Sequence, residues 1–441
     1  MTARSAKISP NLCPCMVDKD LLLLCMTRAR IFPEAGVSRF TKTIMRFSRR
    51  TSWNIEENAL SCAYRERVAL GLPIADLTAS NPTRCGFQYH PALLSALTDE
   101  RALEYDPQPR GLLAAREAVC RYYADHRVQI EPDQIVLTTS TSEAYSFLFR
   151  LLCDPGNEVL VPQPSYPLFD FLADLDDVRI KPAPLVYDHG WQIDAEGFRR
   201  AITPETRAMV LVHPNNPTGH FLKPWEAEEL RRLCLEHGLS LIVDEVFLDY
   251  KFEGHGASFA KGVGEVPVYV VSGLSKVAGL PQMKAAWIVA TGPKRAEAMD
   301  RLDVIADTFL SMNAPVQWAL SHWLGERRAI QDQIRARVVA NLAELDRQLS
   351  EQTLINRLEA EGGWYSVLRI PALERDELTV RELLERGIWV HPGYFFGMGE
   401  SGWLVISLLG QEADFAAGVT TLVAYLGTHL GSNKSANRPQ G

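Results

Sequence analysis

Lys276 is the side chain with the clearest chemical potential in this sequence. It lies in SGLSKVAGLPQMKAAWI (272–288), four residues after an apolar segment that is typical of a buried strand. A lone lysine most often lies on a solvated surface, whereas a lysine in a desolvated site forms Schiff bases with carbonyl compounds. Taken alone, this segment leaves both interpretations open.

Three further segments place polar residues where an apolar run ends. HPNNPTG (213–219) is a rigid turn that can hold an asparagine amide at a fixed angle. Asp244, the first residue of DEVFLDY (244–250), either caps the following segment or faces a buried cation. In TTSTSEAYSFLF (138–149), hydroxyl residues lead into a helix, and the first N–H groups of a helix bind anions. Each segment alone also has a plain structural explanation, as a turn or a cap.

Together the four segments predict a site for a phosphorylated pyridine aldehyde. In open α/β sheets, ligands bind beyond the carboxyl ends of the strands. Pyridoxal phosphate requires a lysine for its aldehyde and a carboxylate that keeps its ring nitrogen protonated. The chain offers an anion cradle, an asparagine turn, Asp244 and Lys276 in this order. Signatures of other sites are absent from the sequence, which has no Walker A loop, dinucleotide glycine fingerprint, HExxH or GxSxG.

These motifs resemble those of the class I and II pyridoxal-phosphate-dependent aminotransferases of fold type I, over roughly residues 76–425. The resemblance implies that Lys276 is the Schiff-base lysine and also the base that moves the substrate's α-proton. It implies that Asp244 pairs with the ring nitrogen and that Asn216 hydrogen-bonds the phenolic oxygen of the cofactor. The other cofactor contacts implied by the resemblance are Ser140 and Thr141 at the phosphate, Tyr166 on the ring face, Ser275 beside the lysine, and Tyr105 from the neighbouring subunit of a homodimer.

Three positions depart from the family pattern. Lys284 stands where an arginine usually grips the phosphate, so the charge remains and the bidentate fork is lost. Phe247 stands where a tyrosine usually donates to the phenolic oxygen, so with Asn216 as the only donor we expect a more basic Schiff base. Val405 stands where an arginine usually binds the substrate's α-carboxylate. The residues expected to contact the substrate instead are Arg84, Arg369 and Asn81.

The elements that must position these residues have the pattern of an α/β protein. From about residue 133, short apolar runs alternate with helical stretches, which is typical of a mostly parallel sheet covered on both faces. A helix is expected at 226–237, ended by Gly238. We therefore expect a three-layer sandwich, as in fold type I enzymes. Its expected strands are 135–139, 158–162, 207–212, 239–244, 268–272 and 285–289.

A smaller α+β domain is expected beside the large one. A long charged helix at 314–351 has the pattern of a helix that bridges two domains. Beyond it, strands are expected at 362–371 and 402–409, with a helix at 380–386 between them. The expected division is a poorly ordered extension at 1–44, with Met45 as a candidate start of translation, a small domain from 45–85 and 315–430, and a large cofactor-binding domain from 86–314.

Composition narrows the classes of protein and partner. The 441 residues include 46 Lys plus Arg and 54 Asp plus Glu, a formal net charge of −8. This acidic balance argues against a nucleic-acid partner, since such binding depends on neutralising many phosphates. No apolar run approaches the roughly 20 residues that span a bilayer. The eight scattered cysteines are typical of reduced thiols, and none stands in a cluster with zinc spacing. We therefore expect a cytoplasmic protein with small-molecule partners and no metal.

The leading hypothesis is a transaminase that moves an amino group between an amine or amino acid donor and a 2-oxo acid. A lyase or decarboxylase on the same scaffold is an alternative, because the orientation of the substrate on the cofactor decides which bond weakens. A protein that binds the cofactor without catalysis is another, and Phe247 and Val405 favour it. Residues 1–44 show no helix-turn-helix pattern that would support a DNA-binding regulator. Without an arginine at position 405, either another cation orients the donor or the donor lacks an α-carboxylate.

Overall fold

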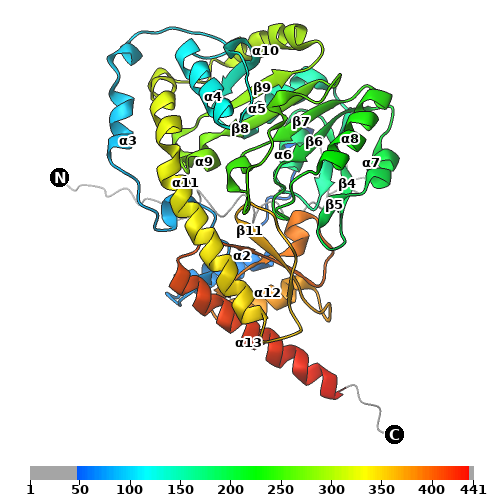
Figure 1. The fold of residues 1–441 in the computed structure, drawn as a ribbon. Coiled ribbons are helices and arrows are strands. Elements are labelled where there is room, and N and C mark those ends of the chain that lie inside the picture. The colour runs from blue at the N-terminus through cyan, green and yellow to red at the C-terminus, as the bar shows by residue number, and fades with distance from the viewer. Residues whose placement is uncertain (1–46, 437–441) are drawn as a thin grey trace, which may run out of the picture.

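The computed structural model describes residues 47–436 of the chain. The expected extension at 1–44 and the candidate start Met45 lie outside the described residues. Figure 1 shows a large sheet with its helices in the upper part and a smaller sheet with its helices below, and the long helix α11 runs along both. Between residues 47 and 436, the structure contains no helix with the length and apolar character needed to cross a membrane.

The large sheet is mostly parallel. Its strands run in the order β2 (Ile135–Thr138), β9 (Ala286–Thr291), β8 (Val268–Gly273), β7 (Ser240–Asp244), β6 (Thr206–Val212), β3 (Glu158–Gln163), β4 (Arg179–Tyr187) and β5 (Trp191–Ile193). The pairs from β8 to β4 are parallel, whereas β9 and β5 are antiparallel to their neighbours. The six expected strands agree with the structure to within two residues at each end. The sequence interpretation missed β4 and β5, because Pro182 and Pro184 in RIKPAPLVY argue against a strand inside a sheet.

Both faces of this sheet are buried by helices. Val210 and Ile242 belong to one apolar cluster, whereas Leu211 and Val243, their neighbours along the strands, belong to the other. Because successive side chains of a strand point to opposite faces, a strand covered on both sides is apolar throughout. The first cluster packs under α5 (Thr141–Leu152), α6 (Phe169–Leu175) and α10 (Arg295–Phe309), and the second under α4 (Leu113–Asp125), α8 (Pro224–His237) and α9 (Leu274–Val277), with α7 (Ala195–Ala201) against α8 and β4.

Helix α8 shows how local sequence sets an element boundary. It ends at Gly238, which has a left-handed φ of 65° and donates its N–H to the carbonyl of Cys234. Glycine adopts this conformation without a Cβ penalty. The expected helix end at residue 237 is therefore confirmed.

The smaller sheet is antiparallel and has the order β10, β11, β14, β13. A separate parallel pair, β1 with β12, joins the segment before residue 85 to the C-terminal part of the chain. The elements of this part are α2 (Ala59–Ala69), β1 (Ala75–Asp76), β10 (Asn356–Arg357), β11 (Tyr365–Arg369), α12 (Asp376–Glu385), β12 (Ile388–Trp389), β13 (His391–Pro392), β14 (Trp403–Ser407) and α13 (Glu412–Ala436).

Helix α11 (Ala314–Leu349) connects the two parts. Its N-cap is Asn313, whose side chain accepts a hydrogen bond from the backbone N–H of Val316. The helix packs against α4 near its start and against α13 toward its end, so it forms a common wall for both sheets (Figure 1). It ends two residues before the expected end at 351.

Candidate functional site

The register of the large sheet brings the ends of its central strands together. Val212, the last residue of β6, lies opposite Asp244 at the end of β7. Gly273 at the end of β8 and Thr138 at the end of β2 both lie opposite Ala286 on β9. The four segments expected to carry chemistry follow directly after these strand ends. The sheet therefore gathers them at one edge.

Asp244 is a buried acid with a defined charge state. It is 8% exposed, and its carboxylate accepts hydrogen bonds from the Tyr145 hydroxyl (3.1 Å) and the Val246 backbone N–H (3.0 Å). Burial raises the pKa of Asp244 to about 6, while these two hydrogen bonds and the charge of Lys276 oppose that increase. The carboxyl group is therefore mostly ionised at pH 7 and lies near enough to Lys276 for their charges to interact.

Lys276 lies in the short helix α9 and is surrounded by aromatic rings. Its Nζ atom is 4.9 Å from the centre of the Trp364 ring and 5.7 Å from that of Phe247. Trp364 in turn packs edge-on against Phe247 and Tyr250, with ring centres 5.1 and 5.0 Å apart. The Tyr250 hydroxyl donates to the backbone carbonyl of Lys276 (2.7 Å). Three buried rings thus hold the lysine at both its backbone and its ammonium group.

The HPNNPTG turn is fixed to the end of β7 and presents Asn216. The backbone N–H of His213 donates to the carbonyl of Asp244 (2.8 Å). The Nδ1 atom of the His213 ring accepts from the Leu222 N–H, and its Nε2 atom lies 3.2 Å from the Ala257 carbonyl oxygen. This pattern suits a neutral imidazole, and burial lowers the pKa of His213 to about 3. Asn216 is 9% exposed, and its Oδ1 has no hydrogen-bond partner within residues 47–436. One edge of this amide is therefore left for a ligand, and a half-turn of the amide exchanges its oxygen and nitrogen.

The start of α5 lies where the sequence predicts an anion cradle. Ser140 is its N-cap and accepts a hydrogen bond from the backbone N–H of Glu143 (3.2 Å). The carboxylate of Glu143 accepts in return from the backbone N–H of Thr139 (2.7 Å). N–H groups in the first turn of a helix, which begins here at Thr141, have no acceptor within the helix and attract an anion.

Lys284 and Ser275 belong to the segment between the end of β8 and the start of β9, the strand that also pairs with β2 ahead of α5. The Leu274 N–H donates to the Ala285 carbonyl (2.9 Å), which holds Lys284 beside the turn that carries Ser275. Lys284 is exposed and has a left-handed φ of 52°. The position supplies one positive charge at this edge of the sheet, without the planar fork of an arginine.

The two aromatic residues expected at the cofactor, Tyr166 and Tyr105, lie far apart in the sequence and differ in burial. Tyr166 follows β3 and is half-buried against the cluster under α5 and α6. Tyr105 is 81% exposed and belongs to the segment between α3 (Ala92–Ser95) and α4. Figure 1 shows this segment running from α3 along the edge of the molecule. Its ring projects from the surface of one chain, where a second molecule has access to it.

The residues expected at the substrate carboxylate are separated by the small sheet. Val405 is fully buried on β14, opposite Val367 and His391, and offers no positive charge. Arg369 lies at the end of β11 remote from Trp364, about 13 Å along the strand from Tyr365. Its guanidinium group donates to the Gly402 carbonyl (3.0 Å) and lies 4.1 Å from the centre of the Trp403 ring. These contacts hold Arg369 away from Lys276.

Arg84 and Asn81 lie at the other end of β11. Their segment contacts this end through a hydrogen bond between Ser80 and Tyr365, and Tyr365 is the neighbour of Trp364. Asn81 caps the short helix Pro82–Arg84, since its side chain accepts from the Thr83 N–H (3.0 Å). Arg84 is exposed, and its side chain forms no ion pair or hydrogen bond with residues 47–436. Of the two arginines, Arg84 is therefore the one whose guanidinium group has no partner within residues 47–436, and its segment contacts the end of β11 that is next to Trp364.

Two residues of the site were not singled out from the sequence. Tyr145, which donates to Asp244, lies four residues after Thr141, and this helical spacing places both on one face of α5. That spacing was a usable signal. Trp364 reaches Lys276 from a segment far along the chain, so only the packing of the small sheet against the large one reveals the contact.

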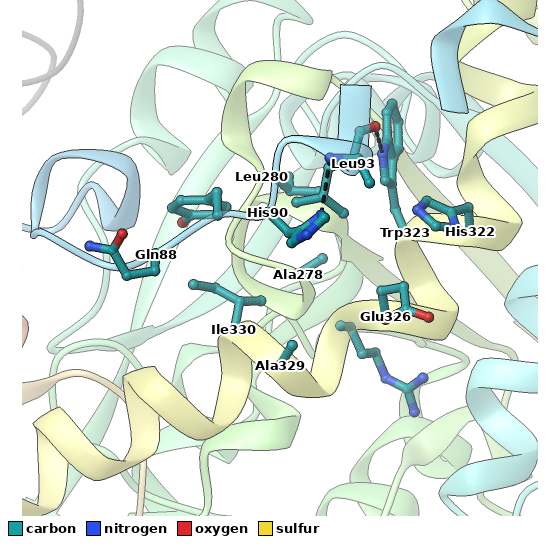
Figure 2. A pocket seen from close by; sticks show the side chains of 13 residues that line it. Gln88, His90, Leu93, Ala278, Leu280, His322, Trp323, Glu326, Ala329 and Ile330 are labelled. Atoms are coloured by element: carbon teal, nitrogen blue, oxygen red, sulfur yellow. Dashed lines mark hydrogen bonds between the residues drawn. The ribbon is translucent and has the colours of Figure 1, made fainter. Parts of the chain in front are cut away.

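A separate cavity lies behind the loop that carries Lys276. Figure 2 shows it between α11 and residues 88–93, with Ala278 and Leu280 in its wall. The Trp323 Nε1–H donates to the Leu93 carbonyl across it (2.9 Å), so this polar group is already satisfied within the chain. Neither Lys276 nor Asp244 lines the cavity, and we therefore place the chemistry at the edge of the sheet.

The residues at the sheet edge fit pyridoxal phosphate. Lys276 offers an amine for the aldehyde, and the ionised Asp244 suits a protonated ring nitrogen. The orphaned amide edge of Asn216 requires a polar ligand atom, because a buried polar group without a partner is costly. The start of α5 and the ammonium group of Lys284 suit a phosphate.

Comparisons with known proteins agree with this geometry. The family model of aminotransferase class I and II matches residues 87–422. The alanine aminotransferase of Mycobacterium tuberculosis is 27% identical over 375 residues, 81% of this chain and 86% of the relative. The aspartate/prephenate aminotransferase of Thermus thermophilus is 28% identical over 334 residues, 74% of this chain and 84% of the relative.

Solved structures share the fold. The alanine aminotransferase from Pyrococcus furiosus superposes with a TM-score of 0.79 at 24% identity, over 87% of this chain and 100% of that one. A single mutant of the aspartate aminotransferase from Thermus thermophilus superposes with a TM-score of 0.76 at 24% identity, over 86% of this chain and 100% of that one. The chain therefore belongs to the aminotransferase class I and II family, and it is a pyridoxal-phosphate-dependent aminotransferase.

Proposed function

We propose that Lys276 binds the aldehyde of pyridoxal phosphate and moves the α-proton of an amino acid whose amino group passes to a 2-oxo acid. One observation carries this assignment: a half-buried lysine, held by three aromatic rings, lies within electrostatic reach of an ionised buried acid. A lysine with this surrounding is suited to condense with a carbonyl group.

The other polar residues hold the cofactor and tune it. When bound, pyridoxal phosphate withdraws electrons from the carbon that carries the amino group. Asp244 supplies the negative charge for a protonated ring nitrogen, and the Tyr145 hydroxyl stabilises that charge. Asn216 holds the phenolic oxygen, and Tyr166 stacks on the ring. The phosphate is assigned to Ser140, Thr141, Ser275 and Lys284.

The substrate's α-carboxylate is assigned to Arg84. Its guanidinium group forms no ion pair within residues 47–436, whereas that of Arg369 is engaged by Gly402 and Trp403. Alanine and aspartate are the donors to test first, since two relatives are named alanine aminotransferase and aspartate/prephenate aminotransferase. Asn81 positions Arg84 by capping its short helix.

We also propose a homodimer in which Tyr105 of one chain contacts the phosphate site of the other. The 81% exposure of its side chain supports this arrangement. Small-molecule partners, a cytoplasmic location and the absence of nucleic-acid and membrane partners are further expectations, which rest on composition.

Chemical trapping tests the assignment of Lys276. Purified protein is mixed with pyridoxal phosphate, reduced with borohydride and digested, and the modified peptide is found by mass spectrometry. We expect the pyridoxyl group on Lys276 and its loss in Lys276→Ala. Lys284→Ala is the matched control, which should retain the label on Lys276 and need more cofactor to saturate.

Turnover completes the test. Wild-type protein should convert alanine or aspartate to its oxo acid only when a 2-oxo acid acceptor is present for repeated cycles. A label on another lysine, or a Lys276→Ala variant with full turnover, would refute the assignment.

A further inference from the structure

We propose that the indole Nε1–H of Trp364 is a hydrogen-bond donor to the cofactor bound at Lys276, where Phe247 lacks a hydroxyl. This inference rests on the proposed role of Lys276. It replaces the expectation that Asn216 alone serves the phenolic oxygen of pyridoxal phosphate.

The first support is an unsatisfied buried donor. Trp364 is 0% exposed, and its Nε1 has no hydrogen-bond partner within residues 47–436. Buried polar groups almost always have partners, because leaving one without a partner is costly. Three other tryptophans of the described chain obey this rule, since Trp53 donates to Asp174 (2.9 Å), Trp287 to Tyr123 (3.2 Å) and Trp323 to Leu93 (2.9 Å); Trp191, far from Lys276 on β5, is an exception.

The second support is the position of the ring. Its centre lies 4.9 Å from the Nζ of Lys276, which is over the ring, and the ring packs edge-on against Phe247, the residue expected near the phenolic oxygen. The atom that Lys276 binds therefore lies beside this indole.

The third support is the rigidity of the segment that carries Trp364. The Trp364 carbonyl accepts from the Leu408 N–H (2.8 Å), and the Gly363 N–H donates to the Tyr250 carbonyl (2.9 Å). Glu361, three residues before Trp364, is fixed as well. Its backbone N–H donates to the carbonyl of Gly219 (3.1 Å), which belongs to the turn that carries Asn216. Trp364 and Asn216, each with an orphaned polar atom, are thus held by the same set of contacts.

A donor at the phenolic oxygen has a measurable electrostatic effect. It stabilises the negatively charged form of that oxygen and so lowers the pH at which the bound chromophore loses its proton. Removing the donor should raise this pH. Trp364 is therefore assigned as a residue that sets the ionisation of the bound cofactor.

The test follows the visible absorbance of protein with bound pyridoxal phosphate as a function of pH. We expect Trp364→Phe, which keeps a ring and loses the N–H, to raise the midpoint by about one pH unit. Trp191→Phe is the matched control: the Trp191 Nε1 is also buried without a partner in residues 47–436, but it lies on β5 at the far edge of the sheet. Its midpoint should equal that of wild type.

A rescue and an isostere separate hydrogen bonding from packing. Adding Phe247→Tyr to Trp364→Phe should return the midpoint toward wild type, because the phenol supplies a new donor beside Lys276. If Trp364→Phe does not fold, benzothienylalanine at position 364 keeps the bicyclic shape and has sulfur in place of the N–H. It should shift the midpoint in the same direction.

The outcomes are distinguishable. An unchanged midpoint in Trp364→Phe or in the benzothienylalanine protein, with Lys276 still labelled by borohydride, overturns this inference and leaves the proposed function intact. If wild-type protein shows no label on Lys276, the proposed function fails and the inference fails with it.

Discussion

Two neighbouring carboxyl groups at the end of β7, Asp244 and Glu245, differ in charge because their surroundings differ. Asp244 has a pKa of about 6 and faces Lys276. Glu245 is 0% exposed and accepts from the Ser258 hydroxyl (2.7 Å) and the Phe259 N–H (2.6 Å). Burial raises the pKa of Glu245 to about 8, and the negative charge of Asp244 adds to the increase. At pH 7 the strand end therefore carries its negative charge at Asp244, where the site needs it.

Glu245 makes the stability of the cofactor-free protein depend on pH. Its folded pKa is about 8 against an ordinary value of 4.5, so its contribution is fully present below pH 4.5 and is lost as pH rises toward 8. Between pH 6 and 8, above the pKa of Asp244, the free energy of unfolding should fall by up to about 1.4 kcal/mol per pH unit.

Urea unfolding of wild type and Glu245→Gln at pH 6, 7 and 8 measures this effect. The amide keeps the acceptor oxygen and cannot ionise, so its slope should be smaller. Glu351→Gln, at an exposed side chain, is the control and should keep the wild-type slope. Equal slopes in wild type and Glu245→Gln would contradict the burial argument.

The choice between Arg84 and Arg369 is a second prediction at this scale. Arg84→Ala should raise the KM for alanine or aspartate about 10- to 100-fold, the loss expected for a charge-assisted hydrogen bond of about 1.5–3 kcal/mol. Arg369→Ala should leave KM unchanged and lower the melting temperature, because it removes the contact with Trp403. Steady-state kinetics of both variants checks this. Unchanged KM in Arg84→Ala would point to a donor without an α-carboxylate.

At the scale of elements, the segment before β11 joins the two sheets. Glu361 forms an ion pair with Lys223 and accepts from the Phe221 N–H (3.1 Å). The close approach of these two segments depends on Gly219 and Gly362, since a Cβ on Gly219 would lie 2.5 Å from the Gly362 carbonyl oxygen. Together with the β1–β12 pair, these contacts support our proposal that residues 45–85 and 315–430 form one small domain against a large domain at 86–314.

Gly362→Ala tests this crossing. The added Cβ would lie 2.4 Å from the Tyr250 carbonyl oxygen, so the segment that carries Trp364 must move away from Lys276. We expect a loss of about 1–3 kcal/mol in unfolding free energy and weaker binding of pyridoxal phosphate. Gly325→Ala in α11 is the matched control: nothing lies within 4 Å of its Cβ, and it should stabilise the protein by about 0.5–1 kcal/mol. Equal behaviour of the two variants would contradict the close packing.

At the scale of the whole molecule, the surface near α3 carries apolar side chains that one chain does not cover. Leu103 is 91% exposed and Tyr105 is 81% exposed. Exposed apolar groups that lie close together often mark protein interfaces. They support the proposed homodimer, in which each site is completed by Tyr105 of the other chain.

Complementation between an inactive variant and an impaired one tests that arrangement. Lys276→Ala lacks the proposed lysine, and Tyr105→Phe lacks the hydroxyl that would serve the partner. In mixed two-fold dimers, one of the two sites has both residues, so dimers purified through both tags should have about half of the wild-type sites. The measurement is turnover of co-purified, differently tagged chains. Mixed dimers without activity above that of either variant alone would exclude sharing of Tyr105 between subunits.

The sequence by itself determined six of the eight strands of the large sheet, the order of the chemical motifs and the family, because apolar periodicity and short-range turns are local properties. Lys276, Asp244 and Asn216 follow strand ends, and parallel strands bring such ends to one edge. Only the tertiary structure decided which distant residues complete the site. Trp364 reaches Lys276 through packing between two sheets, and Arg369 is held by Trp403. These contacts, like the pKa of Asp244, arise from burial and long-range packing, which residue spacing does not encode.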